Sequence, residues 1–120
     1  MKRDPSFPEL FELIGFFEAE PVLTDQSEEW YYNHLAYTTV RGRDRFECEM
    51  EPSNFLIKLR WYQEEKEMLD LILETMTSLT IETQGGLEVM RVRFSSEEGL
   101  LIVELKPLIH FSLHLKDTHK

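Results

Sequence analysis

Two histidines near the C-terminus belong to the residue type that most often binds transition metals. His110 and His114 are four residues apart, and on a strand that rises about 3.3 Å per residue their rings stand roughly 13 Å apart. Zinc ligands lie about 2 Å from one ion, so this pair needs His34 or a carboxylate from another strand to chelate zinc. We therefore predict no metal site and interpret the pair as exposed residues on a terminal strand.

Cys48 is the single cysteine of the chain and could act as a nucleophile, with His34 or His110 as its base. It lies between Phe46 and Met50, on the apolar side of an alternating segment. Burial raises the pKa of a thiol and makes it unreactive, so we predict a core residue and not a nucleophile. A single cysteine also excludes an internal disulfide and suits a reducing compartment.

Three carboxylates, Glu47, Glu49 and Glu51, are expected on one side of that segment. A glycosidase needs two carboxylates about 5–9 Å apart across a cleft, and neighbours on any strand meet this distance trivially. We instead predict charge pairing across strands. The chain has no glycine-rich loop before a helix and no nucleotide-binding pattern, so we predict no cofactor and no enzymatic activity. The outward-facing basic partners are Lys58, Arg60, Arg91 and Arg93.

One helix is expected at the N-terminus. Ser6 and Glu9 have the spacing of a capping box, Pro8 fits the first turn, and Pro21 ends the helix. Apolar residues follow at helical spacing, which predicts a face that packs on the rest of the chain. This predicted face consists of Phe7, Leu10, Phe11, Ile14 and Phe17.

After Trp30 the apolar residues alternate with polar ones, which indicates strands. Residues 63–76 fit two interpretations: helix propensity favours a helix, whereas the regular spacing of turns favours a strand. We favour the strand. The other predicted strands cover residues 35–40, 45–51, 55–61, 79–83, 90–94, 101–105 and 109–115.

One-sided alternation in successive strands predicts an antiparallel sheet with one dry and one wet face, and the helix can cover the dry face. The predicted fold is therefore α+β. We expect an N-terminal amphipathic helix packed on a curved, mainly antiparallel β-meander of six to eight strands, in a single domain over residues 1–120.

Charge limits the function. The chain has 13 Lys and Arg against 23 Asp and Glu, a net charge of −10, which argues against nucleic acid or an anionic membrane as the partner. No apolar stretch approaches the ~20 residues that span a bilayer, and no targeting signal is evident, so we expect a cytoplasmic protein. Residues 1–30 hold two basic and eight acidic side chains, a net charge of −6, so the excess is concentrated there.

The acidic N-terminal segment leads into three consecutive aromatic residues. Negative charge speeds association with a basic protein, and aromatic side chains serve as anchors at interfaces. Alternatively, the aromatic residues close the rim of the core. The predicted binding surface comprises Glu18, Glu20, Asp25, Glu28, Glu29, Trp30, Tyr31 and Tyr32.

Two classes of function follow from these patterns. The first is a non-catalytic acidic module that binds a basic protein partner, such as an immunity or inhibitor protein that neutralises a cationic toxin or nuclease. The alternative is a small-ligand binder or minor enzyme that uses the concave face of the sheet. An exposed edge strand can also pair with a second copy, which leaves a homodimer open.

Overall fold

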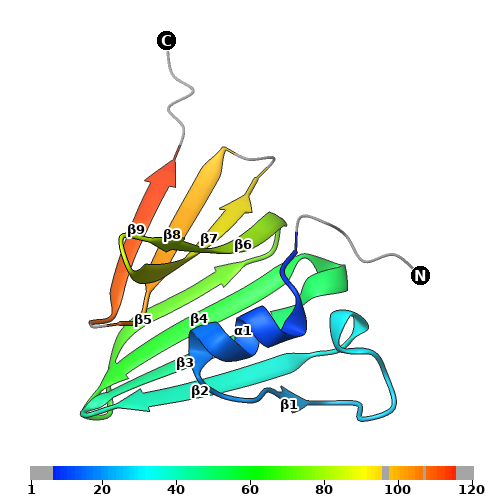
Figure 1. Cartoon of the computed structure of the whole chain (residues 1–120), viewed down its shortest axis with the longest axis horizontal. Coiled ribbons are helices and arrows are strands. Elements are labelled where there is room, and N and C mark those ends of the chain that lie inside the picture. Colours follow the sequence, from blue (N-terminus) through cyan, green and yellow to red (C-terminus); the bar gives the residue numbers. More distant parts are fainter. Residues whose placement is uncertain (1–6, 96–97, 107, 116–120) are drawn as a thin grey trace. The chain divides into compact units, whose positions relative to one another are not determined.

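The structure is a computed structural model that describes residues 7–95, 98–106 and 108–115. These residues form one α-helix, two short 3-10 helices and nine strands in two antiparallel sheets (Figure 1). The chain divides into two compact units, which we describe separately. The five-stranded unit is Phe17–Glu74, and the four-stranded unit comprises the described residues up to Phe16 and from Thr75 onward.

The five-stranded unit is a meander in which each strand pairs with the next one along the chain, in the order β1-β2-β3-β4-β5. Short hairpins connect β2 to β3 and β4 to β5, while the 3-10 helices η1 (Trp30–Tyr32) and η2 (Pro52–Asn54) precede β2 and β4. The strands are β1 Val22–Leu23, β2 Leu35–Arg41, β3 Asp44–Glu51, β4 Leu56–Gln63 and β5 Lys66–Leu73.

The register of the strands gives this sheet two distinct ends. At the first, Leu35, Met50, Ile57 and Leu73 follow one another across β2 to β5, and η1 and η2 lie in contact there. We call it the loop end. At the other end, the β2–β3 and β4–β5 hairpins turn at residues 42–43 and 64–65. We call it the hairpin end.

The dry face of this sheet confirms the predicted alternation. Phe46, Cys48 and Met50 are fully buried. Phe17 packs above them, with its ring centroid 4.4 Å from Tyr37 and 6.1 Å from Phe46. The backbone at Phe17 is also held to the sheet, because the Thr39 hydroxyl donates a 2.7 Å hydrogen bond to the carbonyl of Phe17.

The four-stranded unit is a second meander, in the order β6-β7-β8-β9. Its β6–β7 hairpin turns through Gly85 and Gly86, whose positive φ angles of 57° and 85° favour glycine. Alternating residues of β7 and β8 are buried, as predicted, including Met90, Val92 and Leu101. The strands are β6 Met76–Gln84, β7 Leu87–Phe94, β8 Gly99–Glu104 and β9 His110–Leu115.

The helix α1 (Leu10–Phe17) exists as predicted, but its buried face was predicted only in part. Phe17 is buried as predicted, Phe11 is 73% exposed, and the buried Leu13 and Phe16 were missed. The segment LFELIGFF is apolar on nearly all sides, so periodicity could not determine which side is buried. Of the other predicted residues, Phe7 is buried, and Leu10 and Ile14 are half-buried.

The start of the helix is capped differently from the prediction. Ser6 lies outside the described residues, and the Glu12 carboxylate accepts a 2.8 Å hydrogen bond from the backbone N–H of Glu9. Glu9 therefore precedes the first helical residue, with Glu12 three residues later. None of the described helices is long and apolar enough to cross a membrane.

Two further differences and one confirmed interpretation concern the sheets. The single meander of six to eight strands is instead nine strands in two sheets, and β1 was missed because its two residues are too short to alternate. Residues 66–73 form strand β5, which confirms the strand interpretation of that ambiguous region. Phe55 is not in β4: it follows η2 with a φ of 60° and is 53% exposed.

Candidate functional site

The predicted surface residues divide between the two ends of the five-stranded sheet. Because β1 runs antiparallel to β2, residues before β1 lie toward the hairpin end and residues after it toward the loop end. Glu18 accordingly forms an ion pair with Arg41, the last residue of β2. Glu20 lies between Glu18 and β1. The loop end holds the other predicted residues, Asp25, Glu28, Glu29, Trp30, Tyr31 and Tyr32.

Asn33 fixes the shape of the acidic loop. It is buried, and its Oδ1 accepts hydrogen bonds from the backbone N–H groups of Asp25 (3.1 Å) and His34 (2.9 Å). Its Nδ2 donates to the carbonyls of Asp25 and Glu28. Asn33 was not predicted from the sequence. A buried amide that makes all its hydrogen bonds stabilises the conformation of the loop around it.

Asp25 is fixed within the same loop. Its Oδ1 accepts hydrogen bonds from the hydroxyl of Ser27 (2.7 Å) and from the backbone N–H of Ser27 (3.0 Å). These two bonds lower the pKa of Asp25, because both stabilise the ionised carboxylate. The loop therefore presents a negative charge in a defined position.

The three aromatic residues of η1 differ in exposure. Their rings meet edge to face, with centroids 5.8 Å apart for Trp30 and Tyr31 and 5.3 Å apart for Tyr31 and Tyr32. Trp30 and Tyr31 are half-buried, whereas Tyr32 is 41% exposed. Tyr32 is therefore the ring best placed to contact a partner.

Carboxylates from distant parts of the sequence join the loop end. Glu51 ends β3, just before η2, which contacts η1. Glu74 follows β5 at the same end of the sheet, three strands away from β2. Within the described part of the chain, none of the carboxylates gathered there forms an ion pair with Lys or Arg, and residues 18–40 and 46–57 contain neither type. We call this group the acidic cluster: Asp25, Glu28, Glu29 and Glu51.

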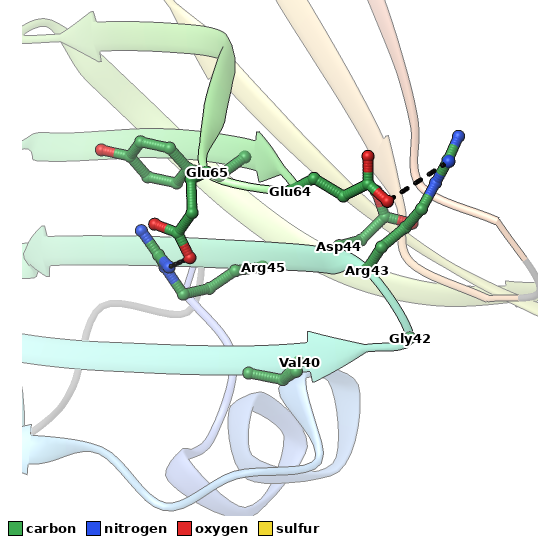
Figure 2. Close-up of a pocket in the computed structure, with 8 residues that line it drawn as sticks. Val40, Gly42, Arg43, Asp44, Arg45, Glu64 and Glu65 are labelled. Carbon is green, nitrogen blue, oxygen red and sulfur yellow. Dashed lines mark hydrogen bonds and ion pairs between the residues drawn. The ribbon is translucent and has the colours of Figure 1, made fainter.

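The hairpin end is electrostatically different (Figure 2). Its arginines form ion pairs with glutamates. A guanidinium nitrogen of Arg43 lies 3.7 Å from a carboxylate oxygen of Glu64, and one of Arg45 lies 3.5 Å from a carboxylate oxygen of Glu65. Arg45 also lies over the ring of Tyr62, with its guanidinium carbon 4.4 Å from the ring centroid. A pocket of about 240 Å³ opens among these side chains, and its lining includes two arginines and three carboxylates.

The β4–β5 turn at this end carries two glutamates in a conformation that favours glycine or asparagine. Glu64 and Glu65 have φ angles of 47° and 69°. We expect Glu64→Asn with Glu65→Gly to raise the free energy of unfolding by about 1 kcal/mol, because the left-handed conformation is strained in other residues. Urea denaturation measures this change. A loss of stability would mean that the Arg43 and Arg45 contacts outweigh the strain.

The wet face of the sheet carries a chain of charge contacts between these ends. His34 Nε2 lies 3.0 Å from Glu49, Glu49 lies 3.8 Å from Arg60, and Arg60 lies 3.6 Å from Asp70. The predicted cross-strand pairing is thereby confirmed for Glu49. It is wrong for the other two glutamates: Glu47 pairs with Arg45 of its own strand, and Glu51 forms no ion pair with Lys or Arg among the described residues. Because His34 contacts Glu49 on this face, it is on the opposite side of β3 from Cys48 and does not serve as its base.

Cys48 is fully buried, and burial raises the pKa of its thiol far above the usual range, with a smaller contribution from Glu49. We expect the native protein to react with a thiol reagent many times more slowly than the unfolded protein, because the thiolate is the reactive form. A thiol reagent that releases a coloured group on reaction allows both rates to be followed by absorbance, with and without denaturant. Equal rates would contradict the burial of this residue.

The histidines of β9 remain without a metal-binding arrangement. His114 Nε2 lies 2.9 Å from the hydroxyl of Ser112, and both side chains point away from the dry face of the sheet. In the described ranges, no three His, Cys, Asp or Glu side chains are close enough together to hold a metal ion.

Comparison with known proteins adds a likeness in fold. One chain of a contact-dependent growth inhibition toxin–immunity protein complex from Klebsiella pneumoniae 342 superposes with a TM-score of 0.76. The match covers 89% of this chain and 93% of that chain at 18% sequence identity, which indicates a shared fold. No protein-family model and no curated protein sequence matches the chain.

Proposed function

We propose that this protein is a non-catalytic, acidic interaction module that binds a basic protein partner through the loop end of its five-stranded sheet. In its concrete form it is an immunity protein, working in the cytoplasm, that neutralises a toxin. The fold likeness to a chain of a toxin–immunity complex supports this proposal. The observation that carries it is the acidic cluster beside the exposed ring of Tyr32.

Physical reasons connect this arrangement to binding. Carboxylates without a basic neighbour create a negative potential that extends into solvent and attracts a positively charged protein. At the hairpin end three arginines form ion pairs with carboxylates, so the negative field is stronger at the loop end and orients the approaching partner. Tyr32 then provides an amphipathic ring that can be desolvated on contact.

Two alternatives are weaker. A small-ligand binder would use the pocket at the hairpin end, where Arg43 and Arg45 already contact carboxylates of the same chain. An enzymatic toxin would need a catalytic group, but Cys48 and the His34–Glu49 pair lie on opposite faces of the sheet. We therefore favour the immunity side of such a pair.

Capture of the partner tests this function. The tagged protein is incubated with lysate of its native organism at low and at high salt, and bound proteins are identified and purified. We expect a basic protein that is retained at low salt and released at high salt, because exposed charges are screened. The captured protein alone should slow bacterial growth, and co-expression of this chain should restore it. Growth inhibition by this chain alone would instead assign it to the toxin side.

A further inference from the structure

A separate feature is the outer edge of the four-stranded sheet. Strand β9 (His110–Leu115) pairs with β8 in an unbroken antiparallel register and is the last strand of its sheet. Exposed edges are normally protected by Lys, Pro, charged residues or a β-bulge. The sequence of β9, HFSLHL, contains no Lys, Arg, Asp, Glu or Pro, and its pairing has no bulge.

The side chains on one face of β9 are also apolar and exposed. Leu113 and Leu115 lie opposite Leu101 and Gly99 of β8, on the same face of the sheet as the buried Leu101. Yet Leu113 is 52% exposed and Leu115 is 68% exposed. The dry face of this sheet therefore continues onto its edge strand without being covered there.

Charge indicates what can cover this edge. The chain has a net charge of −10, so two copies repel each other over most of their surface. The described residues from Glu98 to Leu115 include only two carboxylates, Glu98 and Glu104, and one amine, Lys106. Two copies can therefore approach each other along β9 without bringing many like charges together.

We propose that a second copy of this chain pairs with β9, antiparallel and edge to edge, to form a two-fold symmetric dimer. Pairing continues the sheet from one copy into the other and satisfies the backbone N–H and C=O groups of the free edge. Residues opposite each other in an antiparallel pair share a face, so with the two-fold axis near the middle of β9 the exposed Leu113 side chains of both copies lie next to each other. This proposal is independent of the partner bound at the loop end.

Sedimentation velocity over a concentration range tests the dimer. We expect the full chain to shift from monomer to dimer as its concentration rises. We expect Leu113→Lys to weaken the dimer about tenfold or more, because it brings like charges together beside the two-fold axis. Val40→Lys is the matched control, since Val40 is 66% exposed on the other sheet. A monomer at every concentration, or equal weakening by both variants, would overturn the proposal.

Cysteine cross-linking tests the register without depending on affinity. In a symmetric antiparallel pair one residue lies opposite its own copy, so single cysteines placed in turn at positions 110–115 should cross-link strongly at one position near the centre. The native Cys48 is buried and gives the background. Efficient linking at Ser112→Cys or Leu113→Cys, with weak linking at the strand ends, supports the pairing. Equally weak linking at all six positions would indicate random collision and overturn it.

Discussion

Replacing Phe17 with Ala should lower the free energy of unfolding by about 3–5 kcal/mol, as expected for a buried aromatic residue cut to a methyl group. Phe17 is fully buried and stacks on Tyr37 at 4.4 Å, beside Phe46. Its removal leaves a cavity above the dry face of the five-stranded sheet, where Tyr37 and Phe46 lose a packing partner. Denaturant unfolding followed by circular dichroism measures the change.

Phe11→Ala is the matched control, because it makes the same chemical change in the same helix at a side chain that is 73% exposed. We expect a change within about 0.5 kcal/mol, as for surface substitutions in general. A large loss for Phe11 would mean that this side chain is buried, as predicted from the sequence, and little loss for Phe17 would contradict its packing on Tyr37.

The buried face of a strand could be predicted from the sequence more accurately than the buried face of the helix. Alternation in β3 identified Phe46, Cys48 and Met50 correctly, because Glu and Arg residues mark the wet face of that strand. The helix offered no such contrast, since its residues LFELIGFF include one charged side chain. Phe17 was predicted correctly, but only packing against the rest of the chain determines that Phe16 is buried and Phe11 is exposed.

The candidate site was predicted in part, for a similar reason. The acidic loop and its aromatic residues were recognised because they are contiguous in the sequence. The separation of Glu18 from Asp25 depends on the two-residue strand β1, which no pattern reveals. The presence of Glu51 and Glu74 at the loop end depends on strand register. The loop conformation fixed by Asn33 depends on hydrogen bonds between residues that are distant along the loop.

Charge reversal within the acidic cluster should slow association with the basic partner. Glu28→Lys combined with Glu29→Lys should lower the association rate constant at low salt by about tenfold, and flatten its dependence on salt concentration. Both side chains are exposed, and neither has an ion pair with Lys or Arg within the described residues, so the free energy of unfolding should change little. The unfolding measurement checks that point.

A second double variant separates the local effect from that of overall charge. Glu64→Lys with Glu65→Lys also reverses two adjacent exposed glutamates and changes the net charge of the chain equally, but at the hairpin end. It places the same new charges at the opposite end of the five-stranded sheet. If the field of the whole protein steers the partner, both double variants should behave alike.

The most direct test is the association rate constant of the purified partner with the wild type and these two double variants, measured by stopped-flow fluorescence at several salt concentrations. If the partner binds at the loop end, the association rate constant at low salt should fall steeply in the Glu28 and Glu29 variant. It should fall much less in the Glu64 and Glu65 variant. The three proteins should converge at high salt, where exposed charges are screened. Equal losses in both variants, or a larger loss for the Glu64 and Glu65 variant, would contradict binding through the acidic cluster.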